Sequence, residues 1–107
     1  MFLTLSHQQL NVFTCSKTLV LEVYRLAKTF PESEKFGMIS QIRRAAVSVH
    51  LNIAEGASRK SDAERKRFFE IARGSVIEID AVLDIAACLE YLENYNLYTC
   101  HCNHKLL

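Results

Sequence analysis

The chain has 107 residues, of which half are apolar, with one proline, three glycines and a formal net charge of +1. This length and apolar content suit a single domain, residues 1–107, built around one core. No apolar run reaches the roughly 18 to 20 residues that a membrane-spanning helix needs, and residues 1–10 lack the pattern of a secretory signal, so we expect a soluble cytoplasmic protein with no membrane contact.

The first two predicted helices span about residues 8–30 and 35–56. Apolar residues recur at helical spacing in the first, and Pro31 ends that run because proline has no amide proton to donate. Gly56 is expected to form the C-cap of the second helix, since glycine adopts positive φ without steric cost. Within that helix, Ala46 is predicted to let a neighbouring helix approach closely.

The third predicted helix is the longest and spans about residues 62–92. Ser61 and Glu64 form an S-x-x-E capping box at its start. Its apolar residues follow the 3-4-3-4-3 spacing of a helix packed along its length, with Gly74 as a second position of close approach. The connections are short, so consecutive helices should be antiparallel neighbours. Residues 93–107 show little periodicity and predict a short or disordered segment.

Two adjacent arginines occupy different faces of the second predicted helix, which turns about 100° per residue. Arg44 lies in a polar stripe and Arg43 on the flank of the apolar face. Because a buried charge needs a partner, Arg44 is predicted to form an ion pair within the bundle or between subunits, whereas Arg43 is predicted to be exposed or between subunits. The candidates for structural ion pairing or a subunit interface are Arg43, Arg44, Glu55, Glu78 and Asp80.

Charge is unevenly distributed along the chain. Between Arg43 and Arg73 the sequence contains eight Lys and Arg residues but only four Asp and Glu residues. From Gly74 onward it contains five acidic residues, and Lys105 is the single Lys or Arg. Since salt screens charges beyond about 8 to 10 Å, a local basic zone attracts polyanions even in a nearly neutral chain. No base-reading motif is present, which favours weak sequence specificity. A solvated loop is the alternative for any single member of the candidate RNA- or DNA-binding set, Arg59, Lys60, Arg65, Lys66 and Arg67.

Residues that could support catalysis or bind a metal are sparse. Four unevenly spaced cysteines indicate reduced thiols rather than a disulfide framework. Cys100, Cys102 and His104 are zinc-type ligands, but they lack a second pair at the spacing of a structural zinc site. Asp80 and Asp84 lie one helical turn apart and are better explained by a solvated face or by arginine partners than by acid–base chemistry. We therefore expect no enzyme activity, no metal and no cofactor.

Several short motifs distinguish the chain from a generic helical sequence. They are the F-P turn (Phe30, Pro31), the F-G pair (Phe36, Gly37), QIRRAA (41–46), NIAEG (52–56) and ARGS (72–75). With these motifs, residues 8–92 resemble the small four-helix-bundle proteins encoded by bacterial 23S rRNA intervening sequences. That family is similar to the accessory protein of diversity-generating retroelements, a homopentameric barrel that binds nucleic acid and the reverse transcriptase. The resemblance implies an antiparallel, up-down-up-down four-helix bundle, a homopentamer as the favoured assembly, and no known catalysis.

The chain departs from the family pattern at two places. His50 stands where the family usually has proline, so a helix kink expected there is weakened or absent. Only fifteen residues follow Leu92, so the fourth helix is predicted to be short or incomplete. The first functional hypothesis is a non-enzymatic oligomer that binds RNA or DNA weakly through phosphates. The alternative is an oligomeric scaffold that docks an unidentified protein without binding nucleic acid.

Overall fold

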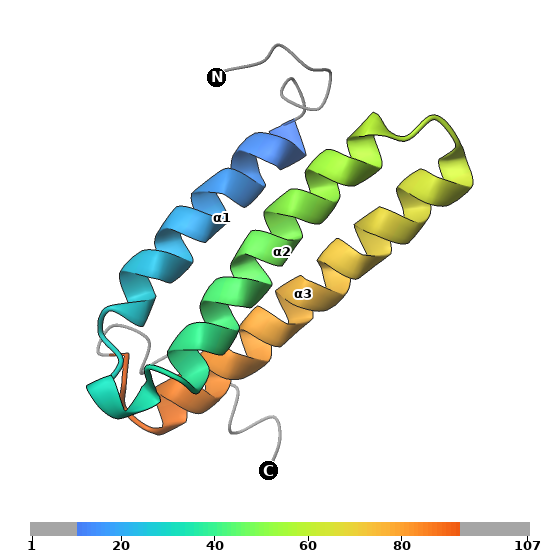
Figure 1. Cartoon of the computed structure of the whole chain (residues 1–107). Coiled ribbons are helices and arrows are strands. Elements are labelled where there is room, and N and C mark those ends of the chain that lie inside the picture. Colours follow the sequence, from blue (N-terminus) through green and yellow to red (C-terminus); the bar gives the residue numbers. More distant parts are fainter. Residues whose placement is uncertain (1–10, 93–107) are drawn as a thin grey trace.

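The computed structural model describes residues 11–92 and shows an all-α chain with three helices side by side in antiparallel order (Figure 1). These are α1 (Asn11–Ala27), α2 (Met38–Ser58) and α3 (Asp62–Cys88), with a short 3-10 helix, η2 (Glu32–Glu34), between α1 and α2. The all-α prediction is confirmed. The predicted fourth helix falls on residues 93–107, outside the described residues. Within the described residues, no helix combines the length and apolar character needed to cross a bilayer.

The central helix, α2, carries most of the core. It packs against both α1 and α3, while the backbones of α1 and α3 scarcely approach each other. Ala46 has no exposed surface, which confirms the prediction that a small side chain permits close packing there. The helix also runs without interruption through His50, as expected from the missing proline. The main core cluster is Phe13, Val23, Ala27, Ile42, Ala45, Ala46, Val49, Ile53, Ala72 and Ile79.

The connection between α1 and α2 differs from the predicted boundary. The first helix ends at Ala27, and the turn that follows places Phe30 in the core before Pro31. The second helix begins at Met38 rather than at residue 35, because residues 32–34 form η2. The Glu34 carboxylate accepts a hydrogen bond from the Met38 amide at 3.3 Å and so satisfies one free donor at the start of α2.

Gly56 does not cap α2, and that prediction is wrong. The helix continues to Ser58, and none of the three glycines has positive φ. A Cβ atom on Gly56 would instead lie 2.7 Å from the ring of Phe69 and 3.1 Å from Cβ of Phe68. The missing side chain therefore lets α2 and α3 approach each other closely near their connection.

The start of α3 agrees with the sequence, but its end does not. The Ser61 hydroxyl accepts a hydrogen bond from the Glu64 amide at 3.1 Å, as predicted. The helix stops at Cys88 rather than at residue 92, because Glu90 adopts a left-handed φ of 64°. The amides of Glu90 and Tyr91 then donate to the carbonyls of Ala87 and Ala86, which is the hydrogen-bond pattern of a Schellman C-cap.

Tyr91 fastens the end of α3 to the connection between α1 and α2. Its hydroxyl donates to Glu34 Oε2 at 3.1 Å, and its carbonyl accepts from Thr29 Oγ1 at 3.0 Å. Its ring centroid lies 5.6 Å from that of Phe30. Burial raises the pKa of the Tyr91 hydroxyl, and the hydrogen bond to the Glu34 carboxylate raises it further. The three helices are thus tied together at the end opposite the α2–α3 turn.

The prediction that Gly74 is a position of close approach is wrong within the single chain. Gly74 is exposed on α3, and a Cβ atom built on it would have nothing within 4 Å. Gly56 and Gly74 are therefore two helical glycines in opposite environments.

We predict opposite effects of alanine at these two glycines. Gly56→Ala should lower the free energy of unfolding by about 1 to 3 kcal/mol, because the new methyl group overlaps the Phe69 ring. Gly74→Ala should raise it by about 0.5 to 1 kcal/mol, because alanine has the higher helix propensity and open space around it. Urea denaturation followed by circular dichroism measures both. Equal shifts in the two variants would contradict the close approach at Gly56.

Candidate nucleic-acid interface

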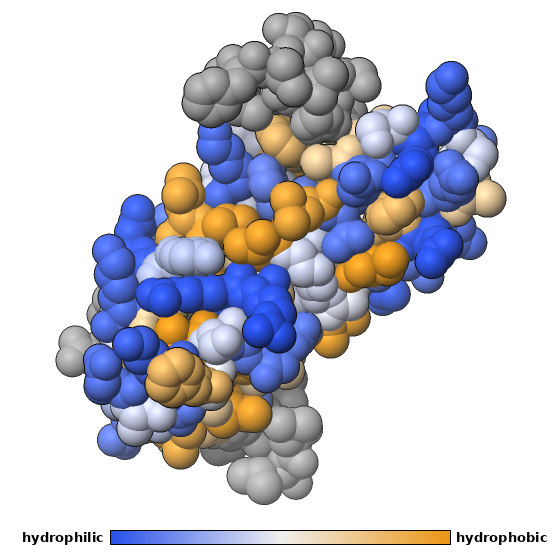
Figure 2. Space-filling model, in the orientation of Figure 1, coloured by the Kyte–Doolittle hydropathy of each residue, from blue (hydrophilic) through white to orange (hydrophobic). Residues whose placement is uncertain are grey.

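The predicted basic residues gather where α2 ends and α3 begins. The chain passes from Ser58 to Asp62 through a three-residue connection, so the last turn of α2 and the first turns of α3 lie at the same end of the molecule. Figure 2 shows hydrophilic side chains over this end. The structure separates the five candidates there into two groups with different surroundings.

Arg65 is engaged within the turn. Its Nε donates to the carbonyl of Arg59 at 2.9 Å, and its Nη2 donates to the carbonyl of Lys60 at 3.2 Å. Its Nη1 forms an ion pair with Asp62 at 2.7 Å. The guanidinium group therefore holds the backbone of the connection against the first turn of α3, and we assign Arg65 a positioning role; its phosphate contact stays a prediction.

Arg59 is also occupied by the protein itself. Its Nη2 lies 2.8 Å from Glu55 Oε2, one helical turn earlier, and its guanidinium carbon lies 5.0 Å from the ring centroid of Phe68. Glu55, predicted to take part in structural ion pairing, thus pairs with a residue that had been placed in the nucleic-acid set. A cation held by both a carboxylate and an aromatic face is less available to a phosphate.

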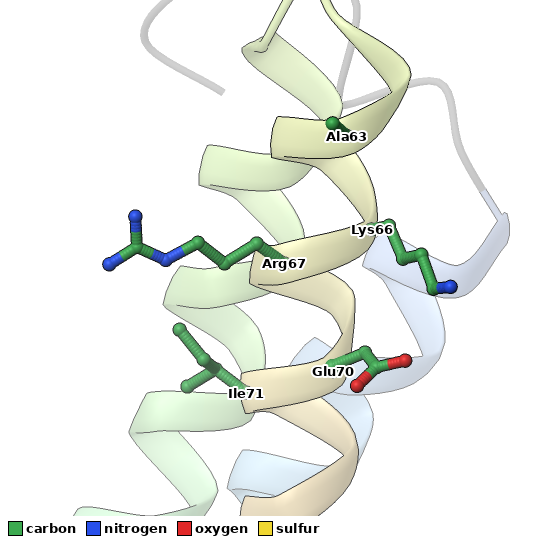
Figure 3. A pocket seen from close by; sticks show the side chains of 5 residues that line it. All are labelled: Ala63, Lys66, Arg67, Glu70 and Ile71. Carbon is green, nitrogen blue, oxygen red and sulfur yellow. The ribbon is translucent and has the colours of Figure 1, made fainter.

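The remaining candidates are exposed and make no ion pair within the part of the chain that the structure describes. They are Lys60, Lys66 and Arg67. Figure 3 shows Arg67 and Ile71 pointing to one side of α3, and Lys66 and Glu70 to the other. These side chains and Ala63 line a shallow, open groove on the outer surface of α3. Positive charge is therefore available on both sides of this groove.

Arg73 is a further exposed cation that the sequence-based set left out. It lies seven residues after Lys66, and at 100° per residue the two side chains leave α3 only about 20° apart. Arg73 likewise makes no ion pair among the described residues. The seven-residue spacing was the signal that could have identified it.

Arg44 does not form the predicted ion pair within the single chain. The ion pairs among the described residues join Glu22 to Arg25, Glu55 to Arg59 and Asp62 to Arg65. Glu78 accepts a hydrogen bond from Gln41 instead, and both Arg44 and Asp80 are exposed. Arg44 lines a surface pocket together with Gln41 and Glu78, but the Glu78 carboxylate is hydrogen-bonded by Gln41. A subunit interface at Arg44 and Asp80 stays a prediction.

Arg43 turns toward α1. Its guanidinium carbon lies 5.0 Å from the ring centroid of Tyr24, and the side chain is half-buried. Its Nε is buried and has no hydrogen-bond partner. Arg43 and Arg44 also lie roughly 20 Å along α2 from the basic turn, at 1.5 Å per residue, so they belong to a different surface.

Clusters of metal-ligating side chains are absent from the described residues. Between residues 11 and 92, no group of three or more His, Cys, Asp or Glu side chains is arranged to bind a metal ion. The cysteines at 100 and 102 and His104 lie outside this range. The Ser16 hydroxyl lies 2.7 Å from His50 Nδ1, but it donates its proton to the carbonyl of Phe13 at 2.8 Å. This partly buried pair links α1 to α2.

We predict that Arg65 stabilises the turn, whereas its neighbour Lys66 does not. Arg65→Ala should lower the free energy of unfolding by about 1 to 2 kcal/mol, because two carbonyls lose a charged donor and Asp62 loses its partner. Lys66→Ala should change it by less than about 0.5 kcal/mol. Urea denaturation of the two variants makes the comparison. Wild-type stability of Arg65→Ala would remove its positioning role.

The sequence matches a known protein family. The family model of the 23S rRNA-intervening sequence proteins matches residues 8–104. No curated protein matches the chain. The match includes all three helices, the connection between α2 and α3, and every basic candidate described above. Because the family model matches most of the chain, the chain belongs to the family of 23S rRNA-intervening sequence proteins.

Proposed function

We propose that this protein is a non-enzymatic, cytoplasmic oligomer that binds RNA or DNA through phosphate contacts at the α2–α3 turn. The observation that carries the proposal is the set of exposed cations without ion-pair partners in the described chain, within that turn and along residues 62–73 of α3. The set consists of Lys60, Lys66, Arg67 and Arg73. We call it the cationic set.

Electrostatics favours an anionic ligand there. Like charges close together repel each other, and those nearest the start of α3 also oppose the positive end of its dipole. A phosphate backbone removes both penalties and releases its own counterions on binding. The free energy of binding would therefore be more favourable, because the ligand neutralises charges that have no partner in the isolated protein.

The arrangement also favours weak sequence specificity. Lys66 and Arg67 extend to either side of the shallow groove on α3 (Figure 3), so they would contact phosphates on both edges of that groove. Contacts of this kind fix position along a nucleic acid but read no base edges. The proposal is accordingly for phosphate-dominated binding to either RNA or DNA.

The proposed assembly is a homo-oligomer, with a homopentamer favoured by the family resemblance. Support from the described residues comes from large apolar side chains at the surface. Leu51 and Ile77, for example, are 56% and 57% exposed. Patches of exposed apolar surface are often covered by another protein surface.

The alternative is a scaffold that docks another protein and binds no nucleic acid. The observation that favours it is Phe36, whose side chain is 91% exposed at the end of the molecule opposite the basic turn. Lys35 Nζ lies 5.7 Å from the centre of its ring. Aromatic residues, including phenylalanine, are enriched at the cores of protein interfaces.

We predict that reversing charge in the cationic set weakens binding strongly. Lys66→Glu/Arg67→Glu should lower the affinity for a generic RNA and for a duplex DNA at least tenfold at about 50 mM salt. The slope of log K against log salt concentration should become shallower by about 2, which corresponds to the loss of about two phosphate contacts. Fluorescence anisotropy over a salt series measures both effects. Lys28→Glu/Lys35→Glu is the matched control, because it changes the charge equally at the opposite end and should leave binding unchanged.

Two results would decide against the proposal. Equal losses in the two double variants would mean that net charge, rather than the turn, controls binding. Absence of binding by the wild-type protein to either nucleic acid at about 50 mM salt would remove the nucleic-acid function and leave the protein scaffold.

A further inference from the structure

Two surfaces outside the cationic set have complementary character. The first lies on the outer side of α1 and α2, where Figure 2 shows apolar side chains crossing the middle of the molecule. A surface groove of about 400 Å³ is found there. We call it the arginine groove and define it by Tyr24, Arg43, Arg44, Val47 and Leu51.

The arginine groove combines exposed apolar atoms with two cations. Tyr24 is 39% exposed and Leu51 is 56% exposed. Neither Arg43 nor Arg44 has a carboxylate partner among the described residues, and Arg43 rests on the Tyr24 ring. A partner that fits this groove must therefore offer both apolar side chains and negative charge.

The second surface runs along the C-terminal half of α3. We call it the acidic ridge and define it by Ile77, Asp80, Ala81, Asp84 and Ile85. At 100° per residue, these side chains leave the helix within an arc of about 140°, roughly opposite the buried Ile79. Ile77 is 57% exposed and Ile85 is 50% exposed. Residues 74–92 contain four acids and no Lys, Arg or His, so the ridge offers the two features that the groove requires.

An unsatisfied charged atom lies at each surface. Among the described residues, the buried side-chain polar atoms without a hydrogen-bond partner are Arg43 Nε in the arginine groove and Asp84 Oδ1 on the acidic ridge. Such atoms destabilise a protein, because they lose water without gaining a partner. One atom belongs to a cation and the other to an anion, so the two surfaces could compensate each other.

A single chain cannot bring the two surfaces together. The arginine groove faces outward from α1 and α2, whereas the acidic ridge faces away from the core side of α3, and α2 lies between α1 and α3. The ridge of one copy can, however, lie in the groove of another. The two patches differ, so this contact is head-to-tail and repeats from copy to copy, and it forms a ring where the rotation between copies closes.

From this complementarity we infer that the acidic ridge of one copy docks into the arginine groove of the next copy. Ile77 and Ile85 pack against Tyr24 and Leu51, while the ridge carboxylates face Arg43 and Arg44. The inference rests on the proposed oligomer and identifies the surfaces that build it. It also assigns Arg43 and Arg44 to assembly, separate from nucleic-acid binding at the turn.

The test is a charge swap in the full chain, read as molar mass by light scattering coupled to size exclusion at about 10 μM. Arg44→Glu and Asp80→Arg each place like charges across the contact, so each should reduce the mass toward the single-chain value of 12.2 kDa. Both side chains are exposed in the single chain, so the helical circular dichroism should persist. The double variant Arg44→Glu/Asp80→Arg restores opposite charges and should recover the wild-type mass. Lys28→Glu is the control and should keep that mass.

The possible outcomes separate this inference from the proposed function. A wild-type mass of one chain would overturn both the oligomer and the docking. A wild-type oligomer whose mass is unchanged in both single variants would overturn the docking alone. Loss of mass in the single variants without recovery in the double variant would also overturn it, because the charges would then act separately.

Discussion

Burial of one face of α2 between two helices that scarcely meet is the constraint on which the structure depends. Residues such as Ile42 and Val49 contribute roughly 1.5 to 3 kcal/mol each when fully buried. Because α1 and α3 both pack on α2, the side chains on this face must be small enough for two helices to approach it. Ala45 and Ala46 provide small side chains in the middle of the helix, and Gly56 has no side chain near the α2–α3 connection. The positions of both outer helices follow from these small residues.

Polar contacts on the two flanks of α2 add directional restraints to this packing. On the α3 side, the Ser75 hydroxyl donates to that of Ser48 at 3.0 Å. On the α1 side, His50 contacts Ser16 and stacks 4.4 Å from the Phe13 ring centroid. Hydrophobic burial tolerates small sliding movements of a helix, whereas hydrogen bonds have a narrow range of distance and angle. These contacts therefore favour one register of α1 and α3 along α2.

Local sequence signals predicted the elements well, because helices and their caps depend on nearby residues. The Ser61 cap is confirmed, whereas the first helix ends at Ala27, before the boundary predicted at Pro31. Gly56 was misassigned because its role depends on Phe69, which approaches it only once α2 and α3 pack together. The end of α3 was missed because Glu90, a residue that rarely takes positive φ, makes the turn without a glycine.

The candidate site was predicted as a charge cluster but not in its internal organisation. Sequence places Arg59, Arg65, Lys66 and Arg67 close together, since they flank a short connection. It cannot show that the guanidinium of Arg65 reaches the carbonyls of two earlier residues, or that Arg59 stacks on Phe68. Those contacts depend on the path of the turn, so charge alone could not separate the residues that hold it from those left exposed.

The local reach of Arg65 also bears on the entropy of ligand binding. Its three acceptors lie within six residues of it along the chain, so the backbone of the turn is fixed without help from a distant element or a ligand. A bound polyanion would therefore not have to order the connection. It would restrict mainly the lysine and arginine side chains that touch it, at a cost of up to about 2 kcal/mol each in rotamer freedom. Pre-organisation of the backbone leaves more of the electrostatic attraction to appear as affinity.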